Sequence, residues 1–247
     1  MIPAMTELPH TITLASASPR RRRLIGWLGF TPRVTSVDTP EDLSSPLAAD
    51  PPRLAQAIAA EKAEAARDAG AGAELAARDA QTGAGLVLAF DTVVAHRGRV
   101  LGKPVDVADA WRMLRELSGE MHEVTTGVAV LVPGVKAPVT FPVTTIVSMR
   151  ALDDAAIAAW LDSGEALGCA GAYNIEHHLA SVADDECYQN VAGMPLCHVY
   201  AALSGGAVGA GAPPAGLTAP VGACDAALGR RCRLGPRVCG GRDGRVL

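Results

Sequence analysis

The stretch LVLAFDTVVAH, residues 86–96, predicts a buried β-strand that carries a functional site. A continuous apolar run is typical of a strand covered on both faces, and Asp91 and Thr92 interrupt this one. Because ligands of open α/β sheets bind where strands end, we expect Asp91 to lie at the end of the buried strand. There its carboxylate can hold Mg²⁺ or act as a general base on water. The ordinary alternative is a capping or turn aspartate.

The segment before this strand predicts a second strand followed by a helix. Residues 11–14 are apolar or β-branched and indicate a short strand. Ser18 and Pro19 then resemble an N-cap and a first-turn residue, and Leu24 lies on the apolar face of the helix that they open. The sequence thus predicts a strand that leads directly into a helix.

Four arginines, residues 20–23, occupy the start of that helix. With Leu24 as the reference, Arg20 and Arg21 lie on either side of the apolar face, and the other two arginines point mostly toward solvent. Arginines beside the free N–H groups of a helix start form a phosphate site, to which the hydroxyl group of Ser16 adds a donor. The alternative is a solvated, charged helix start.

The rest of the chain up to residue 203 alternates between predicted strands and helices. Strands are indicated over 124–132 and 141–149, and helices from Pro52, from Asp106 and from Asp153. Lys62 lies at the edge of the apolar face of the first of these helices. Residues 33–50 are expected to form a loop, and residues 69–85 a surface insertion. Such alternation predicts an α/β fold with a partly antiparallel sheet.

The composition changes sharply after Leu203, from which we place a domain over residues 1–203. Residues 204–247 are rich in Ala, Gly and Pro and then in Cys and Arg. A segment of this composition buries too little apolar surface to order itself, so we expect a disordered tail.

The overall charge excludes several classes of partner. The chain has 22 Lys and Arg against 26 Asp and Glu, a net charge of −4. No whole-protein basic field exists to hold nucleic acid or an anionic membrane, so any anion must be bound locally. We also find no apolar run of about 18 residues and no secretory leader, and expect a cytoplasmic protein.

The six cysteines form no CxxC pair, and we expect reduced thiols. His177, His178, Cys187 and His198 lie close enough in sequence to suggest zinc, but their spacing matches no familiar site. Ordinary polar and core positions are favoured for them. The three cysteines of the tail, with the arginines among them, could also bind metal or a polyanion.

Six separated motifs occur in an order that resembles the Maf family of nucleoside triphosphate pyrophosphatases. They are LASASPRR, AFDTVV, LGKP, LSGEMHEVTTGVAV, CAGAYNIE and NVAGMPL. They extend from about Thr11 to Leu203 and include nothing of the tail. The resemblance implies an elongated, two-lobed α/β fold with a mixed twisted sheet and a central cleft, commonly as a homodimer. It also implies hydrolysis of a nucleoside triphosphate between the α- and β-phosphates, assisted by Mg²⁺ or Mn²⁺.

The resemblance assigns roles to individual residues. Asp91 matches the proton acceptor, and it holds the metal together with Glu41, whose place in the loop is ambiguous against Asp38. The remaining matches are positions tied to substrate choice, at Arg20, Thr92 and Glu176, and basic residues around the triphosphate, at Arg21, Lys62 and Lys103.

One position departs from the family pattern and keeps alternatives open. Glu176 stands where the dTTP- and UTP-hydrolysing branch has glutamine. Glutamine donates and accepts hydrogen bonds, whereas an ionised glutamate only accepts, so this chain could read an amino-bearing base such as cytosine or guanine. Glu176 could instead join the metal. The other hypotheses are a non-catalytic nucleotide-binding regulator of cell division and a metal-binding protein centred on the His and Cys residues.

Overall fold

A computed structural model of the chain describes residues 12–37, 39, 42–43, 45–70, 85–205, 208 and 213–240. It has a mixed seven-stranded sheet in the order β2-β1-β3-β5-β6-β7, with β4 paired to β3. The strands are β1 (Ile12–Ala15), β2 (Arg33–Thr35), β3 (Leu86–His96), β4 (Arg99–Leu101), β5 (Met121–Leu131), β6 (Val139–Met149) and β7 (Ala180–Val182). The first three strands in chain order run parallel, and β3, β5, β6 and β7 are antiparallel neighbours. The predicted α/β fold with a partly antiparallel sheet is confirmed.

Strand β3 has an open stretch on one edge. Strand β1 pairs with residues 86–89 of β3, and β4 pairs with residues 94–96. Within the described part of the chain, residues 90–93 therefore have no strand partner on that edge. The expectation that Asp91 ends the strand is wrong, because β3 continues to His96 and it is the neighbouring strand β1 that ends.

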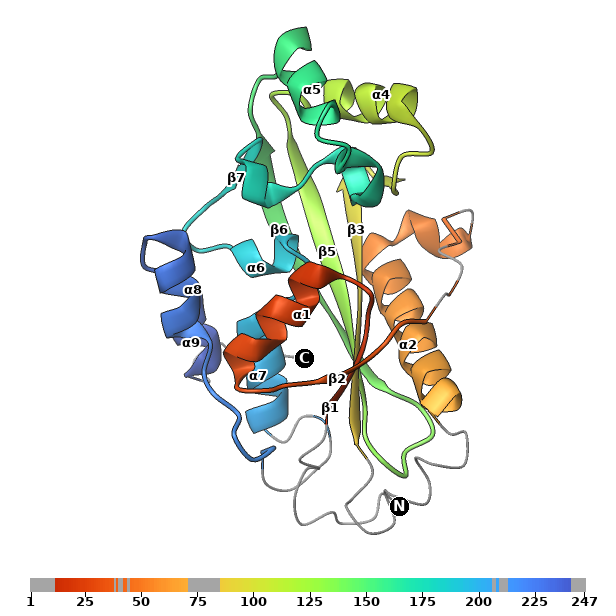
Figure 1. Ribbon diagram of the computed structural model, residues 1–247, viewed down its shortest axis with the longest axis vertical. Helices are drawn as coiled ribbons and strands as arrows, with labels where there is room; N and C mark the ends of the chain where they lie inside the picture. The colour runs from red at the N-terminus through yellow and green to blue at the C-terminus, as the bar shows by residue number, and fades with distance from the viewer. Residues whose placement is uncertain are drawn as a thin grey trace.

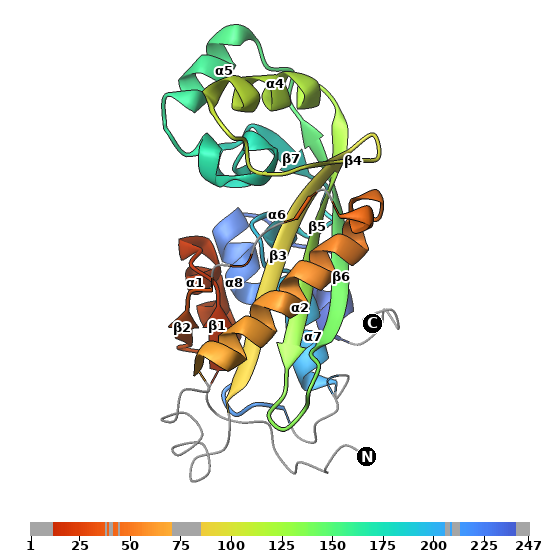
Figure 2. The same cartoon turned by 90° about the vertical axis from the view of Figure 1, so that its right-hand side faces the viewer.

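Helix α2 (Pro51–Gly70) covers one face of the sheet at close range (Figure 2). Its buried side is lined with small side chains, including Ala55, Ala59 and Ala63. A Cβ atom on Gly127 of β5 would lie 2.2 Å from the carbonyl oxygen of Ala55. The missing side chain of Gly127 therefore lets the helix lie directly on the strands.

The other helices cover the opposite face and one end of the sheet (Figure 1). They include α1 (Pro19–Ile25), α4 (Val107–Leu117), α5 (Asp154–Leu161), α6 (Tyr188–Val191) and α7 (Leu196–Ser204). Leu24 of α1 and Val199 of α7 belong to the same buried cluster as Leu88 of β3. Helices α4 and α5 form a smaller lobe at one end of the elongated molecule, the α4–α5 lobe.

Local signals in the sequence place three helix starts correctly. The side chains of Ser18, Asp106 and Asp153 accept hydrogen bonds from backbone N–H groups in the first turns of α1, α4 and α5. The predicted loop at 33–50 instead contains β2 and the 3₁₀ helix η2 (Pro46–Ala49), and α2 extends into the predicted insertion. Residues 71–84 of that insertion lie outside the described residues.

The segment predicted to be a disordered tail contains two helices, so that prediction is wrong for residues 221–239. Helix α9 (Gly235–Cys239) packs on α7, and helix α8 (Val221–Leu228) packs on α9 (Figure 1). Cys224 and Val238 are buried there, and Cys224 belongs to the main hydrophobic cluster. Among the described helices, none is both long and apolar enough to cross a membrane.

Candidate active site

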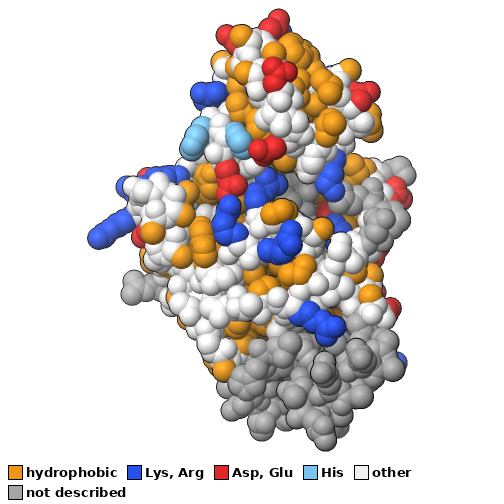
Figure 3. Space-filling model, viewed as in Figure 1, with side chains coloured by type: hydrophobic (Ala, Val, Ile, Leu, Met, Phe, Trp, Pro, Cys, Tyr) orange, Lys and Arg blue, Asp and Glu red, His pale blue; other side chains and the backbone are white. Residues whose placement is uncertain are grey.

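A cavity of about 750 Å³ lies between the α4–α5 lobe and the rest of the molecule. Its lining includes all but one of the predicted site residues, namely Ser16, Arg20, Arg21, Lys62, Asp91, Thr92, Lys103 and Glu176. The exception, Glu41, lies outside the described residues, as does its alternative Asp38. Lys and Arg side chains gather around the hollow on this face of the molecule (Figure 3). Polyanion binding therefore has a structural basis despite the net negative charge.

The open stretch of β3 explains how two successive residues reach one cavity. Asp91 lies on the face of the sheet that carries α2, opposite Gly127 in the antiparallel register. Thr92 lies on the other face, beside α1. Because residues 90–93 have no neighbouring strand on that edge, side chains from both faces line the same cavity.

An ion pair joins Asp91 to α2 at the floor of the cavity. The Lys62 Nζ atom lies 2.6 Å from Asp91 Oδ1, and the two side chains are 12% and 5% exposed. The close approach of α2 at Gly127 brings the helix, and with it Lys62, onto this part of the sheet. The arrangement pairs a buried carboxylate with a cation that a phosphate can also attract.

Arg21 is held in position by hydrogen bonds from three sides. Its Nε donates to the carbonyl oxygen of Gly193 at 2.9 Å, and its Nη2 donates to Thr92 Oγ1 at 3.0 Å. Its Nη1 lies 3.4 Å from Ser16 Oγ. Gly193 has a φ of 101°, and a Cβ atom there would lie 3.3 Å from Arg21 Nε, so this position requires glycine. The guanidinium group is thus oriented before any ligand binds.

Arg20 lies on the other side of the α1 apolar face and also lines the cavity, as predicted. Its Nη1 and Nη2 atoms lie 4.0 Å from the Cys169 sulfur, and its buried Nε has no hydrogen-bond partner. No carboxylate among the described residues pairs with it. Arg20 therefore offers a cation with unused donors to a ligand of this cavity.

Arg23 forms an ion pair with Glu176 that connects the two sides of the cavity. Arg23 is on α1, and Glu176 is on the 3₁₀ helix η5 (Ile175–His177), next to the α4–α5 lobe. The Arg23 side chain is 53% exposed, in agreement with the prediction that it mostly faces solvent. The contact itself was missed, because the two residues are 153 positions apart in sequence.

The motif NVAGMPL supplies support that the sequence did not reveal. The Asn190 side chain is fully buried and donates to the carbonyl oxygens of Val124 and Val143. The backbone carbonyl oxygen of Asn190 accepts a hydrogen bond from Thr126 Oγ1, which lies 2.9 Å from Thr92 Oγ1. Asn190 therefore ties the loop that carries Gly193 to the two central strands of the sheet.

Two buried side chains, Tyr173 and His122, lead from the cavity wall into the protein interior. The Tyr173 hydroxyl group lies 2.7 Å from His122 Nε2, and Tyr173 lines the cavity. Burial, together with the charge of His96, lowers the pKa of His122 to about 4. Burial also raises the pKa of Tyr173. Both groups are therefore neutral near pH 7.

The described residues offer no ready-made metal cage. No three His, Cys, Asp or Glu side chains in that part of the chain are arranged to hold an ion. His177 is one of the residues considered above as a zinc ligand. Its Nε2 atom lies instead 3.3 Å from Glu165 Oε2, and its ring packs on Trp160.

Comparison with known proteins settles the family. The family model described as Maf-like protein matches residues 11–205. The chain belongs to the Maf family. A dTTP/UTP pyrophosphatase from Pelotomaculum thermopropionicum is 38% identical over 190 residues, which cover 76% of this chain and 92% of that protein.

Two further Maf relatives show the same extent of similarity. The dTTP/UTP pyrophosphatase of Xanthomonas axonopodis pv. citri is 41% identical and covers 77% of this chain and 96% of its own length. The dTTP/UTP pyrophosphatase of Chlorobium chlorochromatii is 36% identical, and the match covers 80% of this chain and 96% of that protein. A structure of the Staphylococcus aureus Ham1 protein aligns over 57% of this chain and 72% of its own, with 13% identity and a TM-score of 0.35, too low to add to the assignment.

Proposed function

We propose that this Maf protein hydrolyses nucleoside triphosphates between the α- and β-phosphates, releasing a nucleoside monophosphate and pyrophosphate. The convergence of Arg20, Arg21, Lys62 and Lys103 with the buried Asp91 on one cavity supports the proposal most directly. A triphosphate is a polyanion, and its cleavage depends on groups that neutralise charge in the transition state. The cavity volume is in the range typical of small-molecule sites.

The curated relatives support the same reaction and suggest the substrate class. Those cited above are named dTTP/UTP pyrophosphatase, and each matches this chain over most of both lengths. They give no support to a non-catalytic regulator of cell division. The homodimer that the family resemblance implies stays a prediction.

A divalent cation, Mg²⁺ or Mn²⁺, fits this cavity if the substrate supplies much of its coordination. Asp91 offers a buried carboxylate whose partner, Lys62, entering phosphates would draw away, whereas Glu176 and Glu165 are paired with Arg23 and His177. Mg²⁺ is commonly bound by one or two carboxylates, water and substrate phosphates. Asp91 would therefore hold the ion, and Glu41 is the second carboxylate that the resemblance suggests. Such an ion neutralises charge on the phosphate oxygens.

In the mechanism we propose, Asp91 accepts the proton of the attacking water. Lys62 neutralises Asp91 in the free protein, and entering phosphates compete for the same ammonium group. Its displacement leaves the carboxylate free to act as the base. Arg21, already oriented by Gly193 and Thr92, binds phosphate oxygens through a planar, bidentate group.

Base selection is proposed to lie at the opposite wall, where Glu176 and Arg23 meet. The Glu176 carboxylate accepts hydrogen bonds, and the adjacent guanidinium group donates them. Together they present both kinds of group to the edge of a base. Thr92 and Arg20 are the other two residues assigned to substrate choice.

A panel of nucleotides tests the proposed function. The full-length protein is incubated with dTTP, UTP, dCTP, CTP, dGTP or ATP in the presence of Mg²⁺ or Mn²⁺, and pyrophosphate and monophosphate are measured. We expect the two products in equal amounts from at least one pyrimidine triphosphate. Stepwise release of single phosphates, or no release from any nucleotide, contradicts the proposal. A parallel series with a chelator tests the metal requirement.

A further inference from the structure

Two threonines face each other on neighbouring strands at the inner side of the cavity. Thr92 of β3 and Thr126 of β5 are directly opposite in the antiparallel register, and their Oγ1 atoms lie 2.9 Å apart. Thr92 lines the cavity, whereas Thr126 is fully buried. The function proposed above uses Thr92 and gives no role to Thr126.

The direction of the hydrogen bond between the two threonines follows from a third group. Thr126 Oγ1 lies 3.1 Å from the backbone carbonyl oxygen of Asn190, and a carbonyl oxygen can only accept. The single hydroxyl proton of Thr126 is therefore donated to that carbonyl. Thr126 can then only accept from Thr92, so the hydroxyl proton of Thr92 points toward β5.

This direction leaves the lone pairs of Thr92 for Arg21. Arg21 Nη2 donates to Thr92 Oγ1 at 3.0 Å. A guanidinium group cannot accept a hydrogen bond, so a Thr92 hydroxyl that turned its proton toward Arg21 would repel it. Thr126 opposes that turn, because it offers the Thr92 proton an acceptor inside the protein. The hydrogen bonds therefore run in one direction, from Arg21 through both threonines to Asn190.

The Asn190 carbonyl also organises the second contact of Arg21. It accepts from the backbone N–H of Gly193 at 2.9 Å as well as from Thr126. The carbonyl oxygen of Gly193 in turn accepts from Arg21 Nε at 2.9 Å. Both donors of the guanidinium group thus depend on one carbonyl, Nη2 through the two threonines and Nε through Gly193.

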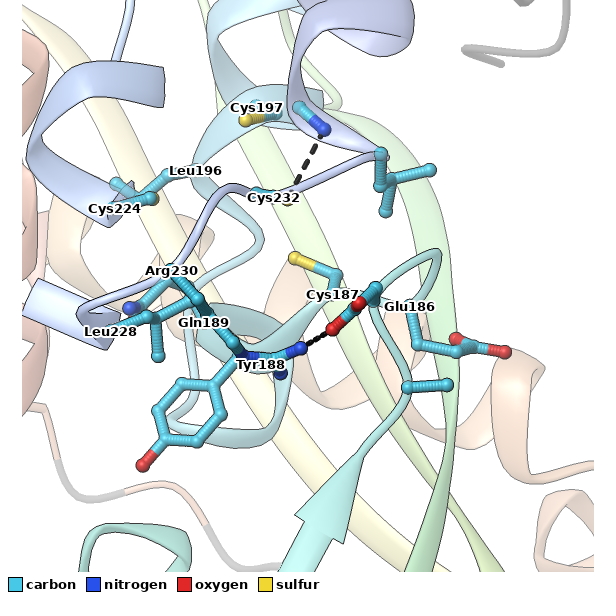
Figure 4. A pocket seen from close by; sticks show the side chains of 14 residues that line it. Glu186, Cys187, Tyr188, Gln189, Leu196, Cys197, Cys224, Leu228, Arg230 and Cys232 are labelled. Carbon is cyan, nitrogen blue, oxygen red and sulfur yellow. Dashed lines mark hydrogen bonds and ion pairs between the residues drawn. The ribbon is translucent and has the colours of Figure 1, made fainter. Parts of the chain in front are cut away.

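The helix that presents this carbonyl is held in place by the C-terminal segment. Asn190 is on α6, and the start of α6 lines a small pocket together with Leu228, Arg230 and Cys232 (Figure 4). Arg230 forms an ion pair with Asp184, just before α6, and the Asp184 carbonyl oxygen accepts from the backbone N–H of Arg233 at 3.0 Å. The position of the Asn190 carbonyl therefore does not depend on the threonines alone.

We propose that Thr126 is a positioning residue for the triphosphate reaction. It holds the Thr92 hydroxyl group in the orientation that accepts from Arg21, and so directs the Arg21 guanidinium group toward the phosphates. The inference rests on the proposed function, in which Arg21 binds phosphate oxygens. Without the Thr126 hydroxyl group, the Thr92 proton can turn away from β5, and the contact at Arg21 Nη2 weakens.

A double-mutant cycle in the full-length protein tests the proposal. Thr126→Val keeps a branched side chain that suits a strand but removes the hydroxyl group. We expect KM for the best nucleotide substrate, and Kd for inorganic tripolyphosphate, to rise about three- to tenfold, with a smaller change in kcat. Thr126→Ser, which keeps the hydroxyl group, should restore both values. In an Arg21→Ala background, Thr126→Val should have no further effect.

Thr125→Val is the matched control. Thr125 is the preceding residue of β5, is also buried, and forms a threonine pair of its own, with Oγ1 2.8 Å from Thr144 Oγ1. Because side chains alternate along a strand, Thr125 lies on the α2 face, away from Arg21. Any cost of placing valine in β5 is common to both variants, whereas only Thr126→Val should raise KM and Kd.

Three outcomes overturn the proposal. One is an equal effect of Thr126→Val and Thr125→Val on KM and Kd. Another is a loss on Thr126→Val that is as large in the Arg21→Ala background as in the wild type, since Thr126 would then act independently of Arg21. The last is failure of both Thr126→Val and Thr126→Ala to fold, judged by circular dichroism, which would show that the hydroxyl group serves the fold.

The tripolyphosphate measurement separates this inference from the proposed function. Binding of tripolyphosphate requires no turnover and no base. If the wild type binds it but releases no pyrophosphate from any nucleotide, the proposed reaction is wrong, and the cycle of Kd values still decides the role of Thr126. A wild-type protein that neither binds tripolyphosphate nor turns over a nucleotide overturns both proposals.

Discussion

Lys62 Nζ lies 2.6 Å from Asp91 Oδ1, and this ion pair is nearly shielded from solvent. It joins the helix on one face of the sheet to the open stretch of β3. Removing one partner of such a pair leaves an uncompensated charge, so the two residues stabilise each other's position as well as serving the proposed reaction. The pair also places the proposed base next to a cation at the floor of the cavity that a bound phosphate could attract.

The first prediction concerns the proposed base. Asp91→Asn keeps the shape of the side chain but removes the proton acceptor, so we expect kcat to fall by roughly 10²- to 10⁴-fold. Pyrophosphate release measures this, and nucleotide binding in the absence of metal should persist, since the arginines are untouched. Asp162→Asn, at the exposed end of α5, is the control. Turnover at the wild-type rate in the Asp91 variant would exclude Asp91 as the base.

The second prediction separates the arginines of α1. Arg21→Ala removes a guanidinium group oriented toward the cavity, and we expect KM to rise by about tenfold or more, with a smaller change in kcat. Arg22→Ala is the matched control, because Arg22 is exposed and, within the described part of the chain, its Nη2 donates to the nearby Ala17 carbonyl alone. Equal effects of the two substitutions would mean that charge alone matters, not orientation toward the cavity.

Comparing sequence and structure shows which features local patterns predict. The helix starts at Ser18, Asp106 and Asp153 depend on hydrogen bonds within a few residues, and the sequence predicts them correctly. The arginines behave similarly, because helical geometry alone places Arg20 and Arg21 beside the apolar face. Their common cavity with Asp91 followed from the family resemblance, not from spacing.

The features that the sequence did not predict depend on distant pairing. Asp91 reaches the cavity because β1 ends beside it. Strand β1 lies more than seventy residues earlier in the chain, so local sequence around Asp91 does not reveal this neighbour. The Arg23–Glu176 ion pair likewise joins two lobes. For the C-terminal helices, average composition concealed the few apolar side chains, such as Val238, that are buried in the folded protein.

A third prediction concerns how the protein recognises the nucleobase of its substrate. Thymine and uracil present an acceptor at O4 beside the N3–H donor, whereas cytosine presents an amino donor at that place. Glu176→Gln replaces a group that only accepts with one that also donates. We therefore expect kcat/KM for dTTP and UTP to rise about tenfold relative to dCTP and CTP, equivalent to about 1.4 kcal/mol.

Kinetics with the four pyrimidine triphosphates measure this ratio. Glu165→Gln is the matched control, because Glu165 also lines the cavity but contacts Asn174 and His177 instead of Arg23. An unchanged ratio in Glu176→Gln, or an equal shift in the control, would show that Glu176 does not read the base.

The fourth prediction concerns the pH dependence of stability. Burial, reinforced by the charge of His96, lowers the pKa of His122 from 6.5 to about 4. Between these pH values the unfolded chain binds a proton that the folded protein does not, so the free energy of unfolding falls as the pH falls from about 6.5 to 4. The whole loss amounts to about 3 kcal/mol for this group. Above pH 6.5 the contribution is fully present.

Urea unfolding at pH 7.0 and pH 4.5 checks this, with His122→Gln as the comparison. The glutamine keeps a polar partner for the Tyr173 hydroxyl group but does not titrate. Carboxylates titrate in both proteins, so their contribution cancels when the two are compared. We expect the wild type to lose about 2 to 3 kcal/mol more than the variant between the two pH values. Equal losses would mean that His122 accepts its proton as readily in the folded protein as in the unfolded chain.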